Sequence, residues 1–188
     1  MSGFAWVEGL EAYCFTVIVG LTSEEAIRRL GGDPHEPQCP RTFEECFWPA
    51  DGPQWAQVGS VDGGLIVAEH NGWRAEECAA GLSRGAIVTS FFRNVEAVMH
   101  FVYAVDGEVV AEFDPLLDTA VVAGTRPRAM DAAMKGLAFG LHAAEPSAMG
   151  LIERLTGVTV SDQWLRQPQR AVRLPSMSEP APRVGVLD

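Results

Sequence analysis

Apolar and polar residues alternate most regularly over residues 98–115, in the stretch VMHFVYAVDGEVVAEFDP. Two runs rich in β-branched and aromatic residues flank an Asp-Gly pair at positions 106 and 107. This pair favours a two-residue hairpin turn, because both central positions of such a turn adopt positive φ. The stretch therefore predicts two antiparallel strands. Counting back from the turn places Ala104 opposite Val109 and His100 opposite Phe113.

The two faces of this predicted hairpin differ in character. His100 lies on a face of small apolar side chains, whereas the opposite face is large, aromatic and edged with acids. A histidine among apolar residues is more often a core residue with one satisfied nitrogen than a catalytic group. We therefore expect a structural role for His100, with a pocket base or ligand anchor as the alternative.

Similar patterns predict the other elements. Strands are expected at residues 13–19, 55–61, 65–69 and 86–92. Thr22 with Glu25, and Thr42 with Glu45, have the spacing of capping boxes, so helices should follow each threonine. Further helices are expected at residues 76–82 and 129–141, then in a segment capped by Ser147, and finally in a last turn capped by Ser161.

The order of these elements predicts an α+β fold. It consists of a mainly antiparallel sheet with helices packed on one side and a helical C-terminal part from about residue 129. We expect one domain over residues 1–166. Residues 167–188 are rich in proline, serine and arginine and poor in core residues, so they predict a proline-rich tail.

Charge narrows the range of partners. The net charge is −11 and the chain contains one lysine, Lys135. Such an acidic protein repels phosphates, so we expect no nucleic acid and no membrane as partners. The acids are scattered, which favours a role in solubility over mimicry of DNA. The longest apolar run, residues 15–21, is too short to span a bilayer, and no signal peptide is apparent. We expect a cytoplasmic protein whose four cysteines are thiols.

Four stretches together resemble a known family: VIVGLTSEEAIRRLGG, GGLIVAEHNGW, FFRNVEAVMHFVYAVDGEVVAEFDP and IERLTGVTVSDQWL. The resemblance covers residues 13–165 and points to an uncharacterised single-domain family that is widespread in actinobacteria. Because that family has no established activity, the resemblance implies the kind of organism and a single domain. It transfers no catalytic residue.

Two motifs suggest chemistry, and each has a simpler interpretation. Residues 81–85 match G-x-S-x-G, but a helix is expected before Ser83 and a strand after it, the reverse of a nucleophile elbow. His35, Cys39 and Cys46 lie close together, yet their spacing lacks the short paired gap of zinc sites. We expect no catalytic residue at Ser83, no metal and no cofactor.

Five residues remain candidates for binding a ligand. They are His70, Trp73, Arg93, His100 and Tyr103, which could stack on and hydrogen-bond a small planar or anionic molecule. The favoured function is a binding or interaction module for a partner protein or small ligand, in a regulatory or self-protective setting. The alternative is a small acid–base enzyme with a pocket around His100, His70 and Arg93.

Overall fold

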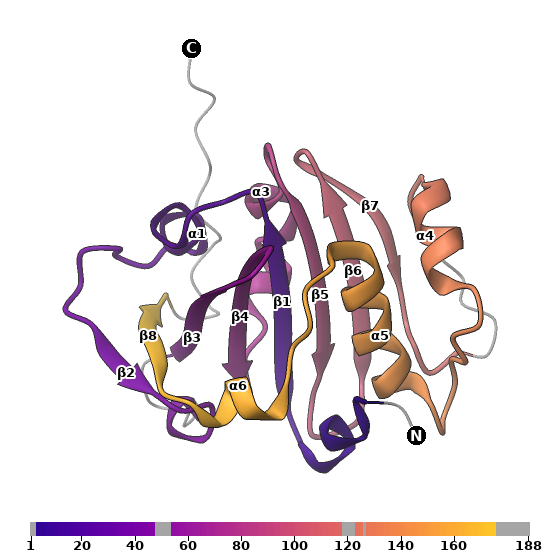
Figure 1. The fold of residues 1–188 in the computed structure, drawn as a ribbon, viewed down its shortest axis with the longest axis horizontal. Helices are drawn as coiled ribbons and strands as arrows, with labels where there is room; N and C mark the ends of the chain where they lie inside the picture. Colours follow the sequence, from indigo (N-terminus) through magenta and orange to yellow (C-terminus); the bar gives the residue numbers. More distant parts are fainter. Residues whose placement is uncertain (1–2, 48–53, 118–122, 126, 176–188) are drawn as a thin grey trace.

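A computed structural model describes residues 3–47, 54–117, 123–125 and 127–175. These residues form one antiparallel sheet of eight strands in the order β2-β8-β3-β4-β1-β5-β6-β7 (Figure 1). The strands are β1 (Tyr13–Val19), β2 (Cys39–Arg41), β3 (Gln54–Val61), β4 (Gly64–His70), β5 (Ile87–Arg93), β6 (Met99–Val105), β7 (Glu108–Phe113) and β8 (Gln169–Leu174). The antiparallel sheet and the α+β class are as predicted.

The helices lie on both faces of this sheet. They are α1 (Ser23–Leu30), α2 (Arg74–Glu77), α3 (Ala79–Leu82), α4 (Arg128–Met134), α5 (Ala144–Thr156) and α6 (Asp162–Arg166), with 3-10 turns η1 (Ala5–Gly9) and η2 (Glu44–Cys46). Figure 1 shows α5 in front of the sheet and α3 behind it. No helix in the described part of the chain is long and apolar enough to span a membrane.

Each face of the sheet has its own apolar core. The face that includes Phe15 packs against α4, α5, α6 and η1, and we call it the α5 face. The face that includes Ile18 packs against α1, α2 and α3, and we call it the α1 face. The prediction that helices pack on one side is therefore wrong. The reason lies in β1, where six of the seven residues are buried, so both faces of this central strand need cover.

The helix α1 begins and ends as its sequence predicts. The hydroxyl of Thr22 accepts a hydrogen bond from the Glu25 amide, and Gly31 ends the helix with φ of 89°. The Glu25 carboxylate accepts hydrogen bonds from Arg28 and Arg29 within the same helix. The second box is complete, since Thr42 and Glu45 each bind the other's backbone amide.

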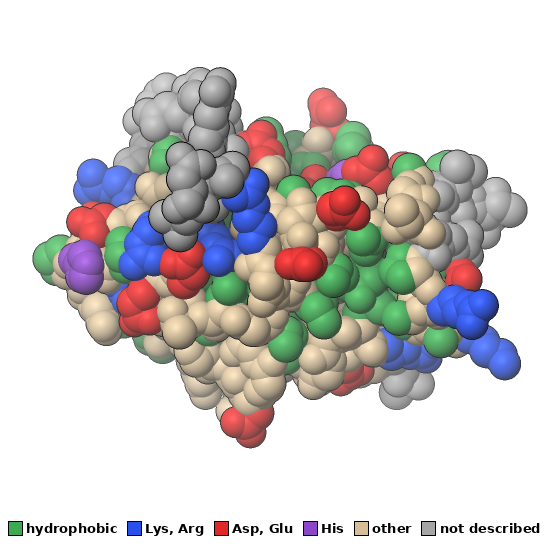
Figure 2. Space-filling model, turned by 90° about the horizontal axis from the view of Figure 1, so that it is seen from above, with side chains coloured by type: hydrophobic (Ala, Val, Ile, Leu, Met, Phe, Trp, Pro, Cys, Tyr) green, Lys and Arg blue, Asp and Glu red, His purple; other side chains and the backbone are tan. Residues whose placement is uncertain are grey.

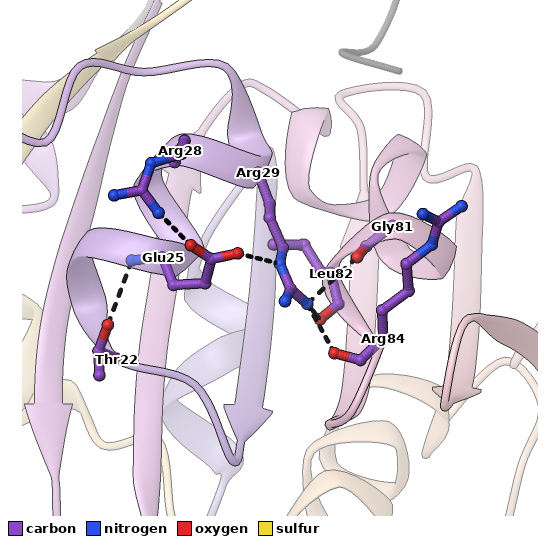
Figure 3. A network of polar contacts seen from close by, with 7 residues as sticks. All are labelled: Thr22, Glu25, Arg28, Arg29, Gly81, Leu82 and Arg84. Atoms are coloured by element: carbon purple, nitrogen blue, oxygen red, sulfur yellow. Dashed lines mark hydrogen bonds and ion pairs between the residues drawn. The ribbon is translucent and has the colours of Figure 1, made fainter. Parts of the chain in front are cut away.

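Arg29 joins α1 to the end of α3 (Figure 3). Its Nη1 donates to the carbonyl oxygens of Leu82 at 3.0 Å and Arg84 at 2.8 Å, and Glu25 holds its Nε at 2.8 Å. A cation at the C-terminal end of a helix satisfies carbonyls that have no partner within the helix. This contact fixes α1 against the helix that precedes β5.

Part of the predicted tail belongs to the sheet. The strand β8, formed by Gln169–Leu174, pairs with β3 on one side and with β2 on the other. The tail boundary at residue 167 is therefore wrong for this segment. Composition hid the strand, because arginines and nearby prolines mask the alternation that buries Val172 and Leu174. The rest of the predicted tail, residues 176–188, lies outside the described residues.

Two predicted helix boundaries also differ. The helix expected over residues 129–141 ends at Met134, and Gly136 follows with φ of 77°. Ser147 lies inside α5, which begins at Ala144, and its hydroxyl binds the Ala138 carbonyl instead of capping the helix. Ser161 does cap α6, since its hydroxyl accepts a hydrogen bond from the Trp164 amide. The helical spacing of apolar residues therefore predicts this helix correctly. The same spacing continues past Gly136, which stops the helix.

The hairpin β6–β7 has the predicted turn but a different register. Asp106 and Gly107 have φ values of 50° and 91°, as the turn type requires. The pairing of Ala104 with Val109 is also as predicted, but the register then shifts, so that Phe101 instead of His100 faces Phe113. An extra residue in β7 forms a β-bulge and moves every later side chain to the other face.

Figure 2 shows the end of the molecule that lies uppermost in Figure 1. On this surface acidic side chains occur at several places, and an apolar area lies between acidic side chains on one side and basic side chains on the other (Figure 2). Such a distribution is consistent with the interpretation of scattered acids that maintain solubility.

Candidate functional site

His100 lies on the α1 face of the sheet beside acids, and the predicted apolar environment is wrong. Its side chain is 36% exposed, and its Nδ1 lies 2.9 Å from Oε1 of Glu76 in α2. Its Nε2 lies 3.8 Å from Oε2 of Glu112 in β7. The bulge explains this arrangement, because it places Glu112 on the face where the regular register would have placed Phe113.

The charges around His100 favour a proton shared with Glu76. The hydrogen bond to Glu76 is the largest cause of the raised pKa of His100; burial opposes it, and the negative charges of Glu76, Glu112 and Asp114 raise the pKa further. Burial raises the pKa of Glu76, and the bond to His100 partly offsets it. The Oε2 atom of Glu76 is buried without a hydrogen-bond partner in the described structure. An imidazole between carboxylates can donate, accept or hold a proton.

Two aromatic rings lie next to this pair. Phe92 in β5 is the direct cross-strand neighbour of His100. The Trp73 ring meets the Phe92 ring edge to face, with centroids 5.5 Å apart. Trp73 immediately precedes α2, which carries Glu76, so the same short segment supplies a ring and a carboxylate. Trp73 thus contacts Phe92, the cross-strand neighbour of His100.

Glu69 fixes α2, and through it Glu76. This fully buried carboxylate accepts hydrogen bonds from the amides of Arg74 and Ala75 at 2.8 Å each, at the start of α2. It also accepts one from Nε2 of Gln54 at 2.5 Å. Burial raises the pKa of Glu69 to about 7, although these three donors lower it. The carboxylate replaces a helix cap at the first turn of α2.

The loop before α2 approaches this cluster too closely for any side chain. A Cβ atom on Gly72 would lie 2.5 Å from Nε2 of Gln54 and 3.0 Å from Oε2 of Glu69. Glycine at this position therefore lets the backbone pass beside the buried carboxylate.

Sequence reasoning missed Glu69, Glu76 and Glu112 as partners of the site. An acid five residues before the start of a short helix was the available signal for Glu69. The spacing alone does not identify the carboxylate as a cap, because a loop must turn back for the contact to form.

Arg93 and Tyr103 lie on the opposite, α5 face of the sheet. Arg93 Nε is 2.7 Å from Oε1 of Glu145 in α5, and its Nη1 donates to the backbone carbonyls of Leu10 and Glu11. Arg93 thereby fastens α5 and the N-terminal segment to the sheet. Tyr103 is buried in the α5-face core, with 6% exposure, and burial raises its pKa.

His70 also lies away from His100. Its ring stacks on Phe43, with centroids 4.6 Å apart, and Phe47 meets it edge to face. Burial lowers the pKa of His70 despite Glu44, whose Oε2 lies 4.0 Å from Nδ1. His70 pairs across the sheet with Tyr13, which places it on the α5 face. The predicted convergence of His100, His70 and Arg93 in one pocket is therefore wrong, because the sheet separates His100 from the other two.

Ser83 has the structural context that its sequence predicts. The helix α3 precedes it and β5 follows. Its buried hydroxyl donates to the Ala80 carbonyl at 3.0 Å and accepts from the Gly107 amide at 3.0 Å. The serine therefore ties the end of α3 to the turn of the β6–β7 hairpin. A nucleophile needs an adjacent base, and the hydroxyl proton of Ser83 is directed to a carbonyl instead.

The four cysteines are free. Cys14 contacts Ser90 and Thr16 within the sheet, and burial raises its pKa. No group of three or more His, Cys, Asp or Glu residues with the geometry of a metal site occurs among the residues that the structure describes.

Comparison with known proteins extends the resemblance seen in the sequence. Neither the curated proteins nor the solved structures include a significant match to this chain. The model of a family of unknown function (DUF6461) matches residues 3–173, a span that includes the helices and the sheet except for the last residue of β8. The chain therefore belongs to this family of unknown function.

Proposed function

We propose that this protein is a binding module that recognises a basic segment of a partner protein at the site formed by Glu76, His100 and Glu112. One observation carries the proposal. A half-exposed histidine on the sheet has a carboxylate at each ring nitrogen, at 2.9 Å and 3.8 Å. This arrangement gathers negative charge where a partner can reach it, since Glu112 is 48% exposed.

The charge of the site and its neighbouring aromatic rings both favour a cationic group as the ligand. Three carboxylates, those of Glu76, Glu112 and Asp114, outnumber the one imidazolium that His100 can supply. Trp73 and Phe92 lie beside this cluster, and the faces of aromatic rings attract ammonium and guanidinium groups. The net charge of −11 would accelerate encounter with a basic partner.

We place this module in the cytoplasm of an actinobacterium, in a regulatory or self-protective role. Free thiols at all four cysteines are typical of reducing compartments, which supports the cytoplasm. The proposal of an actinobacterial source is based on the resemblance of the four sequence stretches. The regulatory or self-protective role is inferred from the proposed binding function.

Fluorescence polarisation with a labelled peptide of alternating arginine and glycine tests the proposal. We expect binding that weakens with salt, and a loss of affinity of about threefold to tenfold in Glu112→Gln. Asp62→Asn, in the turn between β3 and β4, removes the same charge away from the site and is the matched control. Equal weakening in both variants would show attraction by overall charge alone and would refute the site.

A second candidate function rests on the Glu76–His100 pair itself. A carboxylate that orients an imidazole at 2.9 Å is the arrangement used in general acid–base catalysis. His70 and Arg93 would take no part in it, because they lie on the other face of the sheet. Turnover of p-nitrophenyl esters or phosphates by wild type, lost in both His100→Gln and Glu76→Gln, would favour the enzyme. Unchanged turnover in either variant would count against it.

A further inference from the structure

A groove of about 480 Å³ runs along one side of α5, on the far side of the molecule from the α1 face. Positions spaced three and four residues apart line it, as expected for one face of a helix. These positions are Ala143, Pro146, Ser147, Gly150, Glu153 and Arg154. The volume is within the range of small-molecule sites, and the helical wall from Ala143 to Arg154 extends about 16 Å.

Gly150 is a buried residue in the helical wall of this groove. Glycine is a poor residue for the interior of a helix, because its backbone loses more freedom on folding than that of alanine. A Cβ atom at this position would meet Leu137 at 3.5 Å and Phe4 at 3.9 Å, which are ordinary contact distances. A single methyl group would therefore fit at this position, whereas a larger side chain would have to displace Leu137 or Phe4.

The polar groups of the groove are mostly engaged by the protein. The Ser147 hydroxyl donates to the Ala138 carbonyl, and the Glu153 carboxylate accepts a hydrogen bond from Thr159. Arg154 is held by its Nη1, which donates to the carbonyls of Ala133 and Lys135 at 2.8 Å each. Its Nε and Nη2 have no protein partner among the described residues, so they remain available as charged donors.

We propose that this groove binds a small molecule with a carboxylate on an apolar body. Arg154 contacts the carboxylate, since a guanidinium with fixed orientation and unused N–H groups matches a planar anion. Leu137 and Phe4 contact the body. The proposal is independent of the site at His100, which lies on the other face of the sheet.

Titration with 4-phenylbutyrate, followed by amide NMR shifts, tests this inference, with the neutral 4-phenylbutyramide as the matched probe. The amides of Gly136, Ala138 and Gly150 should shift, and the acid should bind wild type at least about tenfold more tightly than the amide does. Arg154→Gln should remove that preference. Arg28→Gln, an exposed arginine of α1, should leave it unchanged.

Gly150→Leu separates loss of binding from loss of folding. The leucine side chain must displace Leu137 and Phe4 and so changes the shape of the groove, and the melting temperature together with the amide NMR spectrum without probe shows whether the variant remains folded. We expect neither probe to bind it. Equal affinity of wild type for acid and amide, no binding of the acid to wild type, retained preference in Arg154→Gln, or retained binding in Gly150→Leu would each overturn the proposal.

Discussion

Glu69 lets the cost of a buried charge be measured directly. Glu69→Gln keeps the shape of the side chain and removes its ability to ionise. The carboxylate is fully buried and faces three donors, the amides of Arg74 and Ala75 and the Gln54 side chain. These donors stabilise the ionised form, whereas burial disfavours it, and burial dominates because the pKa is raised to about 7.

The magnitude follows from linkage between protonation and folding. The folded protein binds a proton at Glu69 up to about pH 7, whereas the unfolded chain releases it near 4.5. The stability supplied by this group is therefore fully present below about pH 4.5 and is lost as pH rises through 7. Between pH 5 and pH 8 the loss amounts to about 2.5 kcal/mol, at about 1.4 kcal/mol per pKa unit.

Urea unfolding of both proteins at pH 5 and pH 8 measures this difference. Glutamine is uncharged like the protonated acid, but its NH2 group must face at least one of the three donors, so the variant should be less stable by about 1–3 kcal/mol at pH 5. Between pH 5 and pH 8 the difference should change by about 2.5 kcal/mol in favour of the variant. Equal denaturant slopes would show that the unfolded states are comparable. Glu96→Gln, at an exposed turn position, is the control and should show no such change. A difference between the two proteins that stays constant from pH 5 to pH 8 would contradict the raised pKa of Glu69.

Four further predictions concern other parts of the molecule. His100→Ala should lower the free energy of unfolding by about 1 kcal/mol, and His100→Gln should lower it less. The stability difference between wild type and His100→Ala should shrink as pH rises through the raised pKa of His100, and a difference that stays constant across pH would contradict the pairing with Glu76. Ser83 should not react with a fluorophosphonate probe, as mass spectrometry of labelled protein can check, and a modified Ser83 would contradict its structural role. Elemental analysis should find no stoichiometric zinc, and one zinc per chain that is lost in Cys39→Ser would reverse this expectation. Deleting Val110 from the bulge should cost less stability in denaturant than deleting Val102 from the regular strand β6, and equal costs would show that the bulge is not where the extra residue lies.

Local signals account for the elements that the sequence predicted well. The strand Tyr13–Val19, the helix ended by Gly31 and the turn at residues 106–107 each depend on residues next to one another in the chain. A capping threonine, a glycine with positive φ and a run of β-branched residues act within a few positions. These signals predict the same local structure whatever elements the rest of the chain forms.

Contacts between distant segments account for the elements that were missed. The strand β8 is recognisable only beside β2 and β3, because its own composition is that of a polar tail. Predicting which candidate residues lie on which face of the sheet would also have required the order of the strands, since β1 separates β4 from β5. His70 and Arg93 both pair with Tyr13, yet His100 projects to the other side. Sequence proximity gave no information about this division.

The bulge in β7 shows why the environment of His100 could not be obtained by counting from the turn. A regular register would direct Glu112 into the α5-face core and Phe113 toward the α1 face. Burial of a carboxylate among aromatic rings is costly, and burial of a phenylalanine is worth about 2–3 kcal/mol, so one extra residue is the less costly solution. The observed register buries Ala111 and Phe113 with Phe101 and brings Glu112 to His100. Packing of Phe113 in the α5-face core therefore fixes the register of β7, and this register places Glu112 beside His100 on the opposite face.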